Sequence, residues 1–233
     1  MIRGRRIFLT GGAGFIGASL IGRLVDNNEV VVYDTFARNA LAAKPWARHS
    51  NLRIVDGDVL DPARLREAMA GADIVVHLAA IAGVDTVLKS PTTTMRVNLL
   101  GTYNVLEAAR AAGRCERLVT FSTSEVFGTY AYRVSEGDTV TTGAVGEARW
   151  TYAVSKLAGE RYVGVYGPLY GIPCSSVRLF SVYGPRQRKQ VVYDLIDRLS
   201  RDPTRLVVIG DGSQQRDFVF VEDVAEAMIA VAE

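Results

Sequence analysis

The chain contains 233 residues, of which 48% are hydrophobic and 22% are charged. A chain of this size and composition is not disordered, because it can bury a sizeable core as one large domain or as one domain with a fragment. Its 27 Lys and Arg residues nearly balance its 25 Asp and Glu residues without a run of like charge, so we expect no nucleic-acid partner.

The cysteines and the hydropathy pattern indicate the compartment. Cys115 and Cys174 are too few for a disulfide framework and too far apart for a redox or zinc motif, so we interpret them as small buried hydrophobes and expect no metal. Basic residues near the N-terminus are not followed by an apolar signal segment, and no uncharged apolar stretch approaches the roughly 18 residues that span a bilayer. We therefore expect a cytoplasmic protein with no membrane partner.

Short β-branched runs alternate along the chain with segments of helical period, a pattern typical of a parallel sheet covered by crossover helices. Asp61 and Pro62 suit the start of the second helix, as a capping carboxylate and a first-turn proline. Right-handed crossovers then give a doubly wound sheet. The predicted strands are 6–10, 30–34, 52–56, 73–78, 117–122 and 175–180, and the predicted helices between them are 15–27, 61–70, 91–112 and 152–170.

The character of the chain changes after residue 180. Residues 183–186 read as a turn, and an amphipathic helix is predicted over 191–200. Strands are predicted over 206–209 and 218–221, and a last helix from Glu222. This tail is too small to be an independent domain, so we divide the chain into a region of residues 1–180 and a partial region of residues 181–233 that can interleave with it.

A glycine-rich loop follows the first predicted strand and opens the first predicted helix. Gly11 permits a tight turn, Gly14 lets backbone amides approach a pyrophosphate, and Gly17 lets helix and strand pack closely. A glycine triplet alone is as often an ordinary turn, but the strand, turn and helix around it predict a dinucleotide site. The predicted cofactor-binding residues of this loop are Gly11, Gly14, Phe15, Ile16 and Gly17.

Acidic and apolar residues at the ends of the next strands extend this site. Asp34 ends the second strand, where a carboxylate accepts hydrogen bonds from the adenine ribose and repels a 2′-phosphate, so NAD is favoured over NADP. Arg38 lies close enough to weaken this preference. Further cofactor contacts, each of which could equally be a plain strand end, are predicted at Asp58, Val59, Leu78, Ala79 and Ala80.

Tyr152 and Lys156 are four residues apart and therefore share one face of a helix. A nearby ammonium group stabilises a phenolate and lowers the pKa of the phenol from about 10. Such a phenolate can take a proton from an alcohol while hydride leaves for a nicotinamide. The pair therefore predicts the oxidation of a secondary alcohol, and both residues are also counted as cofactor-binding.

Hydroxyl groups and one carboxylate follow the fifth strand, at the sheet edge where ligands bind. We expect Thr123 to bond the oxygen being oxidised, and Glu125 is either a second base or a solvated loop acid. Asn98, within a crossover helix, more often bridges backbone than reacts. The predicted catalytic set is Tyr152, Lys156, Thr123, Ser124 and Glu125, and Asn98 and Ser122 complete the predicted cofactor site.

Taken in order along nearly the whole chain, these motifs resemble the extended short-chain dehydrogenase/reductases, specifically the NAD-dependent epimerase/dehydratase family that acts on nucleotide-sugars. The likeness includes residues 178–186, which read R-L-F-S-V-Y-G-P-R, and residues 210–224. It implies a Rossmann-type doubly wound parallel sheet with a small, truncated C-terminal substrate-binding portion, bound NAD and a homodimer through the helices near Asn98 and Tyr152. The substrate-binding residues that it implies are Arg149, Ser181, Arg186 and Arg216.

The resemblance leaves the net reaction open. Thr123-Ser124-Glu125 is similar to the threonine-x-glutamate of 4,6-dehydratases and UDP-glucuronate decarboxylases, and Arg149-Trp150-Thr151-Tyr152 is similar to the arginine-tryptophan-x-tyrosine of the decarboxylases. After oxidation to a 4-keto sugar, the outcomes are epimerisation, dehydration and loss of a 6-carboxylate. The substrate is expected to be a UDP-sugar, with a uronate favoured by Arg149.

Two features depart from the family pattern. Ser181 replaces the usual asparagine, which weakens an expected diphosphate contact. Family members also usually continue past the helix that starts near Glu222, and that stretch completes the substrate pocket. An alternative of another class is therefore a non-catalytic NAD-binding module, although such a module would need neither Tyr152 nor Lys156.

Overall fold

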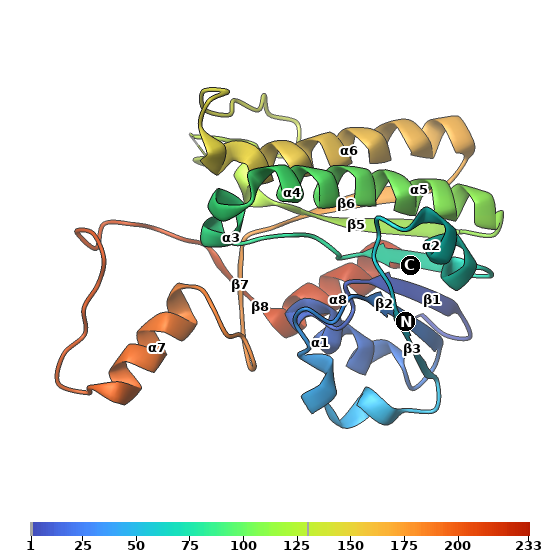
Figure 1. Cartoon of the computed structure of the whole chain (residues 1–233), viewed down its shortest axis with the longest axis horizontal. Helices are drawn as coiled ribbons and strands as arrows, with labels where there is room; N and C mark the ends of the chain where they lie inside the picture. The colour runs from blue at the N-terminus through green and yellow to red at the C-terminus, as the bar shows by residue number, and fades with distance from the viewer. Residues whose placement is uncertain (1, 130) are drawn as a thin grey trace.

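The computed structural model describes residues 2–129 and 131–233 and has one six-stranded parallel sheet at its centre (Figure 1). The strand order is β3-β2-β1-β4-β5-β6, with every neighbouring pair parallel. This doubly wound order confirms the predicted Rossmann-type α/β class. The strands are β1 (Arg6–Thr10), β2 (Glu29–Asp34), β3 (Leu52–Asp56), β4 (Ile74–His77), β5 (Arg117–Thr123) and β6 (Cys174–Leu179).

The central strands are buried and largely apolar because helices cover both faces of the sheet. Ile7 and Leu9 of β1 face one core cluster, whereas Phe8 between them faces the other. Helices α1 (Phe15–Leu24) and α8 (Val221–Ala232) cover the first face. Helices α2 (Pro62–Met69), α5 (Gly101–Ala112) and α6 (Thr151–Tyr170) cover the second.

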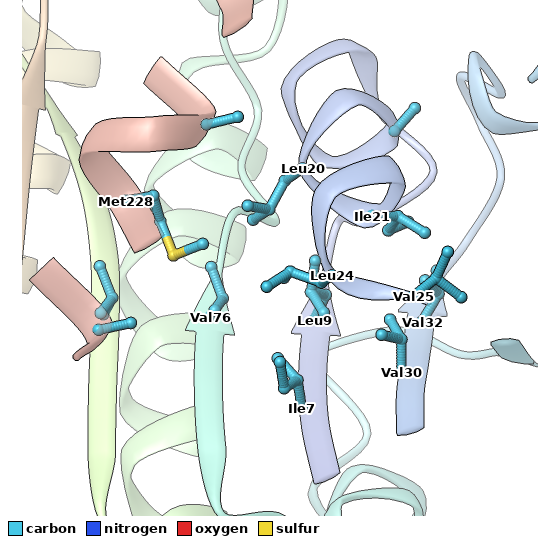
Figure 2. Packing of buried hydrophobic residues seen from close by; sticks show 14 of the residues in the cluster. Ile7, Leu9, Leu20, Ile21, Leu24, Val25, Val30, Val32, Val76 and Met228 are labelled. Atoms are coloured by element: carbon cyan, nitrogen blue, oxygen red, sulfur yellow. The ribbon is translucent and has the colours of Figure 1, made fainter. Parts of the chain in front are cut away.

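The last helix, α8, belongs to the core of the large sheet. Met228 is 1% exposed and points toward Val76 of β4 and Leu20 of α1 (Figure 2). At the surface, the Arg23 guanidinium pairs with Glu222 and Glu226 at 3.2 and 2.9 Å. Two segments about 200 residues apart in the chain therefore form one helical layer.

The helix predicted over 91–112 is interrupted by one wide turn. It consists of α4 (Pro91–Met95), a π-helical turn (Arg96–Leu100) and α5, and it ends at Gly113 in the left-handed conformation with φ 64°. Single π-turns of this kind are often found at functional sites. Shorter elements absent from the predictions are α3 (Val84–Lys89), the strand β7 (Ser181–Tyr183) and the 3₁₀ turns Leu41–Ala43, Pro45–Arg48, Ser124–Phe127 and Ala148–Trp150.

The part of the chain after β6 contains a second, two-stranded parallel sheet of β7 (Ser181–Tyr183) and β8 (Phe218–Phe220). Helix α7 (Val191–Arg201) stands away from the main body (Figure 1), and it has no buried residue. The predicted strand over 206–209 is wrong. Those residues are irregular and exposed, because no strand in the described part of the chain pairs with them.

Most predicted boundaries agree with the structure within one residue. The first helix is shorter than predicted, because it ends at Leu24 rather than at residue 27. Within the described residues, no helix combines the length and apolar character that crossing a bilayer requires.

Candidate active site

The glycine-rich loop lies at the carboxyl edge of the sheet, between the end of β1 and the start of α1. Gly11 has φ 70°, and a Cβ atom there would lie 2.5 Å from the backbone nitrogen of Ala79. A Cβ at Gly17 would lie 2.6 Å from the Cα of Gly12. Gly14 caps α1 without a side-chain hydrogen bond, so the first amides of that helix are left for an external acceptor. This backbone fits a pyrophosphate.

Strand order changes direction between β1 and β4, which places the crevice of a doubly wound sheet at the loop. Leu78, Ala79 and Ala80 follow β4 on the other side of that crevice and are half-buried. The Leu78 amide donates to the Thr10 carbonyl at 3.0 Å, so this segment continues the β1–β4 pairing. Phe15 and Ile16, in the first turn of α1, pack against the core.

The Asp34 carboxylate fastens two backbone segments together. One oxygen accepts from the Ala13 amide of the glycine-rich loop at 3.0 Å, and the other accepts from the Phe36 amide at 2.9 Å. Burial raises the pKa of Asp34, and these backbone donors act in the opposite direction. Each carboxylate oxygen has a further lone pair, so Asp34 can accept hydrogen bonds from a ribose while it keeps both backbone hydrogen bonds. Arg38 is exposed in the same connection.

Asp58 and Val59 follow β3 at the same edge of the sheet. The Asp58 carboxylate accepts from the Leu60 amide at 2.9 Å, and its carbonyl accepts from the Tyr33 hydroxyl at 2.9 Å. Val59 is buried, and its carbonyl accepts from the Asn104 amide group at 2.8 Å. These bonds hold the turn in place beside the predicted adenine end of the site.

Asn98 lies in the π-helical turn, and both the oxygen and the nitrogen of its side-chain amide form hydrogen bonds. Its Oδ1 accepts from the Ile81 amide at 2.8 Å, and its Nδ2 donates to the Ile81 carbonyl at 3.1 Å and to Ser155 Oγ at 3.0 Å. Ser155 Oγ in turn donates to the Tyr152 carbonyl at 2.7 Å. Asn98 therefore joins the segment after β4 to the first turn of α6.

Tyr152 and Lys156 both lie on α6, as their spacing predicts. Lys156 is buried, and its ammonium donates to the Phe121 carbonyl of β5 at 2.7 Å. Burial lowers the pKa of Lys156 to about 8. Burial and the charge of Glu125 raise the pKa of Tyr152. Lys156 is not among the groups that shift the pKa of Tyr152 here, so the acidification of the phenol by the lysine stays a prediction for the enzyme with bound cofactor.

The hydroxyl groups of the predicted site follow one another at the end of β5. Thr123 Oγ1 accepts from the Glu125 amide at 3.3 Å and begins the 3₁₀ turn that carries Ser124. Ser122 is 6% exposed, and its Oγ is buried without a hydrogen-bond partner among the described residues. A buried hydroxyl without a partner fits a site that an external ligand completes.

Glu125 interacts with two charged side chains that lie far from it in the sequence. Its side chain opens to solvent, yet the surrounding protein removes enough water to raise the pKa of its carboxyl. The charges of Arg149 and Arg216 act in the opposite direction on that pKa. The Arg149 guanidinium lies 4.5 Å from the centre of the Trp150 ring. Glu125 thus interacts electrostatically with Tyr152 and with two arginines from other parts of the chain.

The remaining predicted substrate residues lie after β6. The Ser181 amide donates to the Asp217 carbonyl at 3.0 Å, and with Arg216 this residue lines a cavity of about 200 Å³ between β7, β8 and the start of α7. Arg186 is exposed in the following turn with a left-handed φ of 74°. Among the described residues, no group of three or more His, Cys, Asp or Glu side chains is placed to hold a metal ion.

Three residues near this site have roles that were not predicted. His77 and Thr102 are buried beside Asn98, and Phe121 supplies the carbonyl that anchors Lys156. The sequence carried no signal for them, because a histidine or threonine in an apolar strand or helix is usually a hydrogen-bonded core residue.

Residues 7–233 match the NAD-dependent epimerase/dehydratase family. The chain belongs to this family. Membership confirms the predicted enzyme class and makes NAD the cofactor, for which the glycine-rich loop, Asp34 and the unpartnered Ser122 hydroxyl are suited.

Two curated relatives span most of the chain. It is 36% identical over 230 residues to a UDP-N-acetyl-alpha-D-glucosaminuronate decarboxylase of Bacillus cytotoxicus, covering 97% of this chain and 70% of the relative. It is 36% identical over 233 residues to a UDP-glucose 4-epimerase of Mycolicibacterium smegmatis, covering 96% and 72%.

Solved structures agree with this family. A UDP-glucuronic acid 4-epimerase from Bacillus cereus, in complex with UDP-glucuronic acid and NAD, has a TM-score of 0.86 at 32% identity. The match covers 98% of this chain and 73% of that one. A UDP-N-acetylglucosamine 4-epimerase from Methanobrevibacter ruminantium has a TM-score of 0.90 at 27% identity, over 99% and 74%.

Proposed function

We propose that this enzyme oxidises the 4-hydroxyl of a UDP-uronate to a 4-keto intermediate and then decarboxylates or epimerises it. The observation that carries this proposal is that the Glu125 carboxylate interacts electrostatically with Tyr152 and with the guanidinium groups of Arg149 and Arg216. This interaction supports a site in which a base, a second acid-base group and two cations act on one substrate. Relatives that act on UDP-uronates support the substrate class.

Each side chain has a role in the first step. Tyr152 takes the proton of the 4-hydroxyl while the hydrogen on carbon 4 leaves as hydride, and Thr123 bonds the same oxygen. Bound NAD would supply the hydride acceptor and later the donor, and its positive nicotinamide ring would favour the ionised phenol. Lys156, held by the Phe121 carbonyl, has two further donors for the ribose that carries this ring.

The second step depends on the carboxylate of the substrate. A 4-keto uronate is a β-keto acid, so it can lose its 6-carboxylate as carbon dioxide and leave the electron pair on carbon 5, which then takes a proton. Returning the hydride to carbon 4 completes the cycle without consuming cofactor. If the carboxylate is retained, rotation of the ketone before hydride return gives the 4-epimer. Arg149 and Arg216 are the cations available for the carboxylate and the diphosphate.

Product analysis tests this proposal. The protein, supplied with NAD, is incubated separately with UDP-glucuronate, UDP-N-acetylglucosaminuronate, UDP-glucose, dTDP-glucose and GDP-mannose, and products are identified by mass and NMR. Loss of carbon dioxide indicates decarboxylation, loss of water indicates dehydration, and a new stereoisomer of equal mass indicates epimerisation. Turnover of a UDP-uronate supports the proposal. Turnover restricted to neutral sugars contradicts the substrate class, and NAD binding without any turnover indicates the non-catalytic module.

We also propose that the enzyme is a homodimer that pairs through the outer faces of α5 and α6. Tyr103, Val165 and Leu169 are 40%, 57% and 64% exposed on these two helices, an apolar surface that a second copy can cover. Light scattering of the native protein and of the Val165→Arg variant tests this. A native dimer that becomes monomeric in the variant is expected, and a monomeric native protein contradicts the proposal.

The same proposal places the enzyme in the cytoplasm, where nucleotide-sugars are made. Cys115 and Cys174 are unpaired thiols, which suits a reducing compartment. Fractionation of cells that express the full gene tests the location.

A further inference from the structure

His77 is a buried titratable residue that the proposed chemistry does not use. It is the last residue of β4, is 1% exposed and lies at the point where strand order reverses. Its ring is bonded on both sides: Nδ1 is 2.7 Å from Thr10 Oγ1, and Nε2 is 3.0 Å from Thr102 Oγ1. Both threonines are also buried. The ring therefore bridges β1 and α5 from the centre of the sheet.

The direction of these hydrogen bonds follows from counting protons. Thr102 has one hydroxyl hydrogen, which it donates to the Asn98 carbonyl at 2.6 Å, and a carbonyl can only accept. The Thr102 oxygen is then an acceptor for His77, so Nε2 carries the hydrogen. Nδ1 is the unprotonated nitrogen and accepts from the Thr10 hydroxyl. One tautomer satisfies every group in the chain of bonds.

The hydrogen bonds that join Thr10, His77, Thr102 and Asn98 form one network. Both ends of this network contact the segment that follows β4. At one end, the Ala79 amide points to Thr10 Oγ1 at 3.4 Å. At the other, the side chain of Asn98 pairs with the amide and carbonyl of Ile81. The backbone of Ala79 also contacts the glycine-rich loop closely, since a Cβ at Gly11 would overlap it. The network thus sets the distance between the loop and residues 79–81.

The network continues to the helix that carries Tyr152. Asn98 sits in the π-helical turn, and its Nδ2 reaches Ser155 Oγ, which bonds the Tyr152 carbonyl. An unbroken series of hydrogen bonds therefore runs from the last residue of β1 through His77 to the first turn of α6. Such a fully satisfied buried network fixes a single arrangement of the elements that it joins.

The hydrogen-bond network requires a neutral His77 imidazole, and the surroundings of the ring favour that state. Burial and the neighbouring Lys156 ammonium lower the pKa of the ring to about 3. The imidazole therefore stays neutral near neutral pH, where the directions of its hydrogen bonds are fixed.

We propose that His77, as the neutral Nε2–H tautomer, is a positioning residue that aligns the NAD-binding loop and residues 79–81 with the catalytic helix. The inference rests on the proposed function for the role of that helix. It assigns to His77, Thr10 and Thr102 an effect on cofactor affinity that acts through other groups rather than by contact.

The tautomer is measured directly by NMR of the imidazole nitrogens in the full-length protein. The chain has only two histidines, so the His49→Gln variant leaves the His77 signals alone. We expect the pattern of an Nε2–H imidazole that does not change between pH values of about 5 and 9. An Nδ1–H tautomer, or a ring that titrates in this range, overturns the proposal.

The positioning effect is measured by calorimetric NAD titration of matched variants. Thr102→Val removes the hydroxyl but keeps the shape, and Thr102→Ser restores it. Thr94→Val is the control, because Thr94 is equally buried and bonds the Ser90 carbonyl at 3.0 Å without joining His77. We expect Thr102→Val to weaken NAD binding about tenfold and to disturb the His77 signals, with rescue by Thr102→Ser.

The outcomes separate the inference from the proposed function. Equal NAD affinities of Thr102→Val and Thr94→Val, at similar losses of thermal stability, would show a merely structural hydroxyl and overturn the positioning role. An Nε2–H tautomer in a native protein that binds no NAD would instead contradict the cofactor site and, with it, the proposed function. An Nδ1–H tautomer with normal NAD binding contradicts the inference alone.

Discussion

The Lys156 ammonium is 2.7 Å from the Phe121 carbonyl, so the lysine of α6 is anchored to the carboxyl end of β5. This bond uses one of its three donors in a buried position and leaves two for other acceptors. A charged group held in this way is weakly solvated, which makes its charge sensitive to pH.

The free energy of unfolding should therefore depend on pH through the charge of Lys156. The Lys156 pKa is about 8 in the folded chain and about 10.4 in an unfolded chain, so the unfolded state binds more protons between these values. Stability therefore rises with pH in this window, by about 2 kcal/mol from this group alone. Urea unfolding of the native protein and of Lys156→Met at pH values of about 7.5 and 9.5 isolates the contribution. Identical pH slopes for the two proteins would contradict the burial of the charge.

Replacement of the Tyr152 hydroxyl tests the assignment of the base. Tyr152→Phe keeps the ring and removes the proton acceptor, so we expect turnover to fall by about 10²- to 10⁴-fold while NAD affinity stays nearly constant. Tyr170→Phe, at a 44% exposed residue near the far end of α6, is the control and should leave turnover unchanged. Product formation by NMR and NAD titration give the two readouts. Unchanged turnover in Tyr152→Phe would remove this residue from the mechanism.

The role of Arg149 is tested by its effect on two substrates. If its guanidinium meets the carboxylate of a uronate, Arg149→Gln should raise the KM for UDP-glucuronate by about tenfold or more, equivalent to a lost charged hydrogen bond. The KM for UDP-glucose should change little. Arg149→Lys keeps the charge and should recover part of the affinity. Equal increases for both sugars would place Arg149 at the shared nucleotide or in packing against Trp150 instead.

Glu125 is tested by following carbon 5 of the sugar. As a second base it would exchange the hydrogen at that carbon, so Glu125→Gln should slow deuterium uptake from D₂O by about a hundredfold while oxidation at carbon 4 continues. Its raised pKa means that it is protonated at a higher pH than an ordinary glutamate, and exchange should fall as pH falls through that pKa. Exchange that is unaffected by Glu125→Gln would leave the residue as a solvated loop acid.

Alanine substitutions at two left-handed glycines distinguish backbone strain from steric overlap of the added Cβ atom. Gly11 and Gly113 have φ of 70° and 64°, but a Cβ at Gly11 meets the backbone of Ala79, whereas a Cβ at Gly113 meets nothing within 4 Å. Each alanine substitution should cost about 1–2 kcal/mol in left-handed strain. Only Gly11→Ala should also weaken NAD binding, by at least about tenfold, because overlap with backbone must be relieved by movement. Calorimetry and thermal unfolding distinguish the two effects.

Local patterns predicted the sheet well because each strand of the centre is a short, largely apolar run that is buried on both faces. Such runs at residues 7–9, 30–33 and 74–76 are recognisable without knowledge of their partners. The apolar run over 206–209 has the same composition and failed as a strand, since strand formation also needs a neighbour to pair with. Periodicity likewise found the helix over 91–112 but not its π-turn, which Asn98 stabilises through contacts with Ile81.

The candidate site was predictable where one short motif supplies the chemistry, as with the glycine-rich loop and the spacing of Tyr152 and Lys156. It was not predictable where the effect depends on burial or on distant residues. The higher pKa of Tyr152 comes from desolvation and from Glu125, which lies 27 positions earlier in the chain. The bonds of His77 join Thr10 and Thr102, and no local window contains all three residues.

The packing of α8 on α1 has a consequence for the route by which the chain folds. The Arg23 bonds to Glu222 and Glu226 span 199 and 203 positions, so this layer has a very high contact order. During synthesis α1 emerges early, and the part of its apolar surface that faces α8 stays exposed, or covered by a chaperone, until residues 221–232 have been translated. Ribosome-bound chains that stop before α8 should therefore aggregate or remain protease-sensitive, although every strand of the large sheet is already present.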